Sequence, residues 1–153
     1  MNKRTLGRTG LEVSEIGYGA WGLGGNQWRG HKEDDALAAL RHALDNGLNF
    51  IDTALAYNEG HSEQLIARTL KETGAKAYVA TKIPPLNKMW PARPGIAIDK
   101  VFPYRYIVRC TETSLGNLGA EQIDLQQFHV WNPEWIASDE WRRAIADLKS
   151  SGK

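Results

Sequence analysis

Four side chains with acid–base chemistry stand at, or just after, the ends of short β-prone runs in this sequence of 153 residues. They are Asp52, Tyr57, Lys82 and His129. The carboxyl ends of parallel strands meet at one edge of a sheet, where ligands bind, so we expect these side chains to gather at one mouth. Singly, each has an ordinary explanation as a turn or capping device, a solvated charge or a packed wall residue. Their joint occurrence at successive strand ends favours a catalytic site.

This combination of groups suits the delivery of hydride to a carbonyl group, with a proton supplied to the developing alkoxide. A phenol has a pKa of about 10, which must fall to about 7 or 8 for proton transfer near neutral pH. An ammonium beside a phenol favours its ionised form, so Lys82 is expected to activate Tyr57, and Asp52 to keep Lys82 charged and in place. Neutral His129 is expected to hydrogen-bond the carbonyl oxygen of the substrate and fix its orientation. Proton donation of this kind contributes on the order of 10²–10⁴ in rate.

The elements that must position these groups alternate between β-prone runs and segments whose apolar residues recur at helical spacing. The pattern predicts strands at 15–20, 49–52, 77–82 and 123–129, with helices at 33–46, 62–73, 104–118 and from 138 or 139 onward. Gly47 and Gly74 are expected to end the first two helices. The predicted buried face of the third helix consists of Ile107, Cys110, Leu115 and Leu118. Such alternation is typical of an α/β fold with a parallel sheet.

Two segments stand outside this alternation. Residues 3–6 and 12–14 flank a glycine-bearing turn at 7–10 and predict a β-hairpin ahead of the first strand. The connection at 83–103 is long for a loop after a strand, holds five prolines and is therefore expected to carry function. The sequence shows no evident linker, so we expect one structural unit.

Several of these segments also carry the motifs of a known family. They are LGRTGLEVS at 6–14, GYGAW at 17–21, FIDTALAY at 50–57 with GHSE at 60–63, ATK at 80–82 and IDLQQFH at 123–129. Together they resemble the aldo-keto reductases, which are NADPH-dependent carbonyl reductases built on a TIM-type (β/α)8 barrel. By that resemblance Tyr57 is the general acid and Lys82 its modulator, whereas His129 orients the substrate. Asp52 is the partner of Lys82, and both are assigned to the NADPH site.

The resemblance implies an N-terminal half-barrel. Residues 1–14 correspond to the hairpin that plugs the bottom of the barrel, and residues 15–153 to four βα units. Two departures stand out: Asn58 occupies a position where the family usually has glycine, and the chain stops at 150–153 where the family continues into a fifth strand. In the family, most groups that bind NADPH come from the later strands and loops.

A four-stranded half-barrel leaves two open strand edges and an apolar inner face. A C-terminal half, or a second copy of the chain in a homodimer, would cover them. The leading interpretation is an oxidoreductase that reduces a small aldehyde or ketone with hydride from NADPH. The alternative is a non-catalytic half-barrel that serves as a binding or assembly module, since some members of the family are subunits of other machines. A trimmed product with no function of its own is the third interpretation.

Tryptophan side chains recur after the predicted strand ends. Trp21, Trp28, Trp90 and Trp131 fall there. Hydrophobic packing explains part of this distribution, and the rest predicts a substrate pocket with aromatic walls. The predicted substrate contacts are Trp21, Tyr57, Trp90, His129 and Trp131.

Composition and charge argue against several other classes of function. Nineteen basic and eighteen acidic residues leave a formal charge of +1 without blocks of like charge, so nucleic acid and anionic membranes are not expected as partners. No apolar run has the length of a membrane span or a signal peptide, and the single cysteine, Cys110, fits a reducing cytoplasm. The four histidines, at 31, 42, 61 and 129, lack the spacing of metal ligands, so no metal site is predicted.

Overall fold

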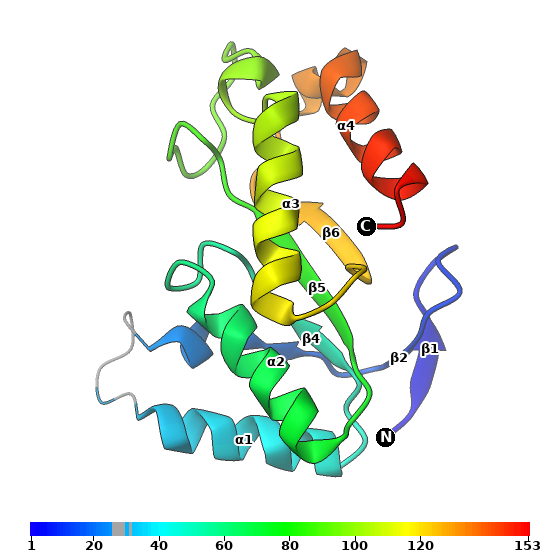
Figure 1. The fold of residues 1–153 in the computed structure, drawn as a ribbon. Coiled ribbons are helices and arrows are strands. Elements are labelled where there is room, and N and C mark those ends of the chain that lie inside the picture. The colour runs from blue at the N-terminus through cyan, green and yellow to red at the C-terminus, as the bar shows by residue number, and fades with distance from the viewer. Residues whose placement is uncertain (26–29, 31) are drawn as a thin grey trace.

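A four-stranded parallel sheet forms the centre of the computed structural model (Figure 1). The structure describes residues 1–25, 30 and 32–153, so Trp28 and His31 lie outside the described residues. The strands are β3 (Tyr18–Gly19), β4 (Phe50–Asp52), β5 (Tyr78–Ile83) and β6 (Leu125–Phe128), in that order across the sheet. Each neighbouring pair is parallel, which confirms the predicted α/β fold.

A helix follows each of these strands along the chain. The helices are α1 (Glu33–Asp45), α2 (His61–Thr73), α3 (Tyr104–Leu118) and α4 (Asp139–Ser150). The ends of α1 to α3 and the start of α4 agree with the prediction to within one residue, and Gly74 ends α2 in the left-handed conformation, with φ of 69°. The described residues also form short 3-10 helices, η1 (Ala20–Gly24), η2 (Ile98–Lys100) and η3 (Pro133–Ala137). Helices that are consecutive in the sequence pack against each other, α1 on α2, α2 on α3 and α3 on α4 (Figure 1).

Two apolar clusters hold the helices against the sheet. The first joins Ile51 of β4 to the apolar faces of α1 and α2, which present Leu37, Leu40, Leu65 and Ile66. The second surrounds Phe102 and Ile107 and joins α3 to α4 and η3. Full burial of one such side chain stabilises the folded state by about 1.5–3 kcal/mol. None of the helices in the described part of the chain is long and apolar enough to cross a membrane.

The first strand is shorter than predicted. The sequence predicts a strand over 15–20, whereas β3 contains only Tyr18 and Gly19 and gives way to η1. Glycine recurs in this segment and weakens a strand because it offers no side chain to pack. In addition, the carbonyl of Ala20 accepts a hydrogen bond from the Ser62 hydroxyl at 3.0 Å, which fixes it to α2.

The buried face of α3 also differs from the prediction. Its buried side chains are Ile107, Cys110, Thr111 and Ser114. The predicted Leu115 and Leu118 are only half-buried. Thr111 can be buried because its hydroxyl lies within hydrogen-bond distance of the Ile107 carbonyl (3.0 Å) and of the Gln126 side chain (3.2 Å).

An antiparallel hairpin precedes the sheet, formed by β1 (Lys3–Thr5) and β2 (Glu12–Ser14). Asn49, which directly precedes β4, binds it by two side-chain bonds. Its Oδ1 accepts from the N–H of Ser14 at 2.6 Å, and its Nδ2 donates to the carbonyl of Glu12 at 2.8 Å. The hairpin therefore lies at the amino end of β4, away from the strand ends that carry Asp52.

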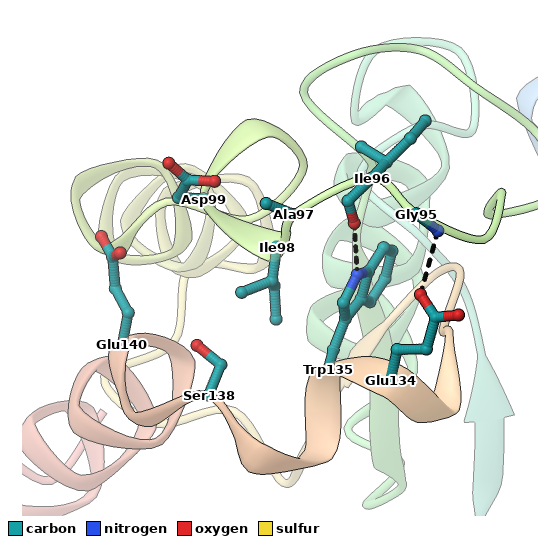
Figure 2. A pocket seen from close by; sticks show the side chains of 9 residues that line it. All are labelled: Gly95, Ile96, Ala97, Ile98, Asp99, Glu134, Trp135, Ser138 and Glu140. Carbon is teal, nitrogen blue, oxygen red and sulfur yellow. Dashed lines mark hydrogen bonds between the residues drawn. The ribbon is translucent and has the colours of Figure 1, made fainter.

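The long connection at 83–103 packs against η3. The indole N–H of Trp135 donates to the carbonyl of Ile96 at 2.7 Å, and the N–H of Gly95 donates to the carboxylate of Glu134 at 2.9 Å (Figure 2). A cavity of about 520 Å³ lies between the two segments, and none of Asp52, Tyr57, Lys82 and His129 lines it. These hydrogen bonds hold residues 95 and 96 of the connection against η3.

Candidate active site

Asp52 and Lys82 form an ion pair at the carboxyl ends of neighbouring strands. Asp52 is paired in register with Ala80, so Lys82, two residues beyond Ala80, faces the same side of the sheet. The Lys82 Nζ lies 2.7 Å from Oδ1 of Asp52 and donates to the carbonyl oxygen of Thr53, also at 2.7 Å. The Lys82 side chain is 13% exposed, against 41% for Asp52. The ammonium is therefore largely removed from water and is held by two oxygen atoms.

Tyr57 reaches this ion pair from the turn between β4 and α2. Its ring centroid lies 5.3 Å from the Lys82 Nζ, within the range of a cation–π contact. The N–H of Tyr57 donates to the carbonyl of Ala54 at 2.9 Å and closes the turn. The next residue, Asn58, has φ of 50°, a conformation that asparagine adopts more readily than most residues. Its side chain donates to the Gly24 carbonyl at 2.8 Å, so the asparagine at this position fits the turn.

His129 completes the group from the end of β6. Its N–H donates to the carbonyl of Ile83 at 3.0 Å, which extends the pairing of β6 with β5 by one step. Its ring packs edge-on against the rings of Tyr57 and Trp90, with distances between ring centroids of 5.6 and 4.5 Å. The structure thus brings all four chemically active side chains to one end of the sheet.

The imidazole of His129 is neutral near pH 7. Burial lowers the pKa of His129 from its ordinary 6.5 to about 4; the nearby Lys82 ammonium contributes, and the Asp52 carboxylate partly opposes it. Its Nδ1 is buried and makes no hydrogen bond to the described residues. A neutral imidazole can donate one hydrogen bond to a substrate oxygen without adding charge.

The lowered pKa of His129 predicts a pH-dependent stability. Below pH 6.5 the unfolded chain binds a proton at His129, whereas the folded protein resists protonation down to about pH 4. The free energy of unfolding should therefore fall as the pH is lowered through this interval, by less than about 3 kcal/mol because His129 is only half-buried and water screens part of the effect. Denaturant titrations from about pH 7 to about pH 4 measure this fall. A His129→Asn variant should lose less stability over the same interval, and equal losses would contradict the assignment.

The predicted aromatic substrate contacts do not all lie together. Trp90 is exposed and contacts His129 directly. Trp131 instead packs among Phe128, Trp135 and Trp141, on the side of the sheet that faces α4. Trp21 is an exposed residue of η1. The geometry therefore links Trp90 to the four central residues, and the substrate contacts of the other tryptophans stay predictions.

Four buried polar residues close to the ion pair were not predicted as functional residues. They are Thr53, Ser62, Glu63 and Thr81. One signal for them is present in the sequence, because Ser62 stands three and four positions before Leu65 and Ile66 and so shares their buried face on α2. The sequence does not indicate which strands these side chains touch. Within the described residues, no three His, Cys, Asp or Glu side chains are grouped as metal ligands.

Comparison with known proteins identifies relatives over nearly the whole chain. A family model described as "Aldo/keto reductase family" matches residues 15–153. Aldo-keto reductase YhdN of Bacillus subtilis (strain 168) is 33% identical, over all of this chain and 45% of its own length. A probable voltage-gated potassium channel subunit beta of Arabidopsis thaliana is 32% identical over 84% of this chain and 37% of its own. The holo form of aldo-keto reductase AKR11C1 from Bacillus halodurans superposes with a TM-score of 0.77 at 31% identity, over 99% of this chain and 47% of its own. The chain thus spans about half the length of the relatives that it matches.

Proposed function

Because the chain belongs to the aldo/keto reductase family and forms half of its (β/α)8 barrel, we propose that it carries the catalytic residues of an NADPH-dependent reductase of aldehydes or ketones. One observation carries this proposal. The Lys82 ammonium is held by Asp52 and the Thr53 carbonyl at 2.7 Å each, and it lies 5.3 Å from the centre of the Tyr57 ring.

In the proposed reaction, the Tyr57 hydroxyl gives its proton to the carbonyl oxygen as that oxygen becomes negative. The Lys82 ammonium stabilises the phenolate that remains, because an opposite charge close by favours the ionised form. Asp52 holds the ammonium in place through the 2.7 Å ion pair. Neutral His129 donates a hydrogen bond to the same carbonyl oxygen and fixes its direction.

NADPH supplies the hydride when it is bound. Asp52 and Lys82 fit the cofactor side of the site, since they present a carboxylate and an ammonium at the strand ends where ligands of barrel enzymes bind. We assign most of the other cofactor contacts to a second half of the barrel, such as the relatives possess. The substrate is a small carbonyl compound that lies beside Tyr57, His129 and Trp90, with Trp21 and Trp131 as further wall residues.

A hydride-transfer assay tests the proposal. The intact protein is mixed with NADPH that carries deuterium at the transferable position and with a panel of small aldehydes and ketones. We expect loss of reduced-nicotinamide absorbance and an alcohol that contains one deuterium at the former carbonyl carbon. Parallel reactions with NADH measure the cofactor preference. The absence of deuterated alcohol from every carbonyl in the panel would contradict the proposal.

A second candidate function is that of an assembly module. The observations that favour it are the edges at β3 and β6, which no other strand of the described residues covers, and the similarity to a protein described as a channel subunit. A homodimer could cover those edges, and the mass of the native protein in solution would reveal it. The single cysteine still favours a cytoplasmic location for either function.

A further inference from the structure

We propose that Ser62 and Glu63 are positioning residues that hold the Lys82 ammonium close to the Tyr57 ring. This inference rests on the proposed function for its catalytic meaning, but the geometry that it concerns can be measured without catalysis. We name these two residues the α2 anchor. They are the second and third residues of α2, and both are fully buried, with 0% exposure.

The Ser62 hydroxyl is hydrogen-bonded to residues that follow two strands, β3 and β4. It donates to the carbonyl of Ala20 at 3.0 Å, just after β3. Its Oγ also lies 2.9 Å from the hydroxyl oxygen of Thr53, just after β4. Since a serine hydroxyl has one proton, and here it goes to the Ala20 carbonyl, Thr53 must donate in the second contact. Thr53 is thereby held by its side chain, while its carbonyl accepts the bond from Lys82.

Glu63 ties a third strand to the same helix. Its Oε1 accepts from the Thr81 hydroxyl at 2.6 Å, and its Oε2 accepts from the Asn117 amide at 2.8 Å. A buried carboxylate without such donors would be costly, so the side chain favours the arrangement in which β5 and α3 are both in place. Its position in the first turn of α2 adds favourable interaction with the positive end of the helix dipole.

The anchor packs closely against the backbone at Gly60, the residue before α2. A Cβ atom at Gly60 would lie 2.2 Å from the Asn117 amide nitrogen and 3.4 Å from Oε2 of Glu63. Gly60 also has φ of 90°, a conformation that other residues rarely adopt. The close contact indicates that the Glu63–Asn117 pair is held against the backbone of the turn that carries Tyr57.

The anchor acts on Lys82 through two neighbours, Thr81 on the same strand and Thr53 just after β4. Thr81 directly precedes Lys82, and the two side chains point to opposite faces of β5. Glu63 therefore holds β5 from the helix side, while Lys82 faces the mouth of the sheet. Thr53 supplies one of the two oxygen atoms that hold the ammonium, and Ser62 holds Thr53. Loss of either hydrogen bond, Ser62–Thr53 or Thr81–Glu63, should let the Lys82 ammonium leave its position near the Tyr57 ring.

A matched pair of variants at Thr81 tests the Thr81–Glu63 hydrogen bond in the intact protein. Thr81→Val keeps the shape of the side chain but removes the donor to Glu63, whereas Thr81→Ser keeps the donor. The readout is the rate at which an amine-directed acylating reagent labels Lys82, measured by mass spectrometry relative to the exposed Lys100. Loss of one hydrogen bond should raise the Lys82 rate about 2- to 10-fold in Thr81→Val. Thr81→Ser should keep the rate of the unaltered protein.

A second pair of variants tests the hydrogen bonds of the Ser62 hydroxyl. Ser62→Ala removes the hydrogen bonds to Thr53 and to the Ala20 carbonyl. Thr69→Ala removes a buried hydroxyl of the same helix whose hydrogen bond, among the described residues, goes to the Leu65 carbonyl of α2. Ser62→Ala should raise Lys82 labelling by a similar factor and lower kcat about tenfold or more, with the KM for the carbonyl substrate nearly unchanged. Thr69→Ala should change neither quantity.

The outcomes separate the inference from the proposed function. Unchanged Lys82 labelling in Thr81→Val and Ser62→Ala would overturn the inference, and so would an equal increase in Thr69→Ala, which would indicate general loosening. If labelling responds as expected but the unaltered protein reduces no carbonyl compound, the positioning of Lys82 stands and the proposed function fails.

Discussion

Replacement of Tyr57 by phenylalanine should lower the rate of carbonyl reduction by about 10²–10⁴-fold. The change removes the hydroxyl that is the proposed proton donor and keeps the aromatic ring. The contacts of that ring with the Lys82 ammonium and with the His129 ring, at 5.3 and 5.6 Å, do not depend on the hydroxyl. The expected loss therefore lies in kcat, while the free energy of unfolding should change by less than about 0.5 kcal/mol. Steady-state kinetics and denaturant titration measure the two quantities.

Tyr104→Phe is the matched control for this experiment. Its hydroxyl donates to the Asp147 carboxylate at 2.8 Å, between α3 and α4, and takes no part in the proposed chemistry. The control variant should reduce carbonyl compounds at the rate of the unaltered protein. A Tyr57→Phe variant as active as this control would show that the proton comes from another group. It would leave the alternative of an assembly module open.

Lys82→Met should lower the rate of reduction by about 10²–10³-fold. Methionine has a similar length but no charge, so the variant lacks the preorganised ammonium that favours ionisation of the phenol. Asp52 and the Thr53 carbonyl also lose the cation that they hold at 2.7 Å. Single-turnover kinetics with bound cofactor would show whether the loss lies in the chemical step.

The double variant Asp52→Asn/Lys82→Met tests whether the two residues act as one unit. If Asp52 acts only by holding the ammonium, its replacement should cost little once Lys82 has been changed. The double variant should then be nearly as active as Lys82→Met alone. Losses that multiply would show that Asp52 has a second role, such as a direct contact with the cofactor.

Much of the fold follows from local sequence signals. The apolar spacing and the terminating glycines predict α1 to α3 to within one residue at each end, because both signals act over a single turn of chain. The errors concern tertiary contacts. The first strand is shortened where Ser62 takes the Ala20 carbonyl, and α3 buries Thr111 because Gln126 on β6 lies within hydrogen-bond distance of its hydroxyl.

For the candidate site, too, the sequence predicts one part and tertiary contacts decide the rest. The order of Asp52, Tyr57, Lys82 and His129 along the chain, each at or after a β-prone run, is enough to predict their gathering, since parallel strands share one carboxyl edge. The packing of Trp131 among aromatic residues near α4 was not predictable, because side-chain direction depends on which helix covers each strand.

By itself, the sequence determined which chemical groups are present, the strands that carry them and the end of the sheet where they meet. Only the tertiary structure decided how far the pKa of His129 falls, which depends on burial, and the position of the Lys82 ammonium, which depends on oxygen atoms from β4 and the residue after it. It also revealed the α2 anchor, whose partners lie just after β3 and β4, on β5 and on α3, up to 54 positions away. Charge and desolvation depend on distances in space, and spacing along the chain does not encode those distances.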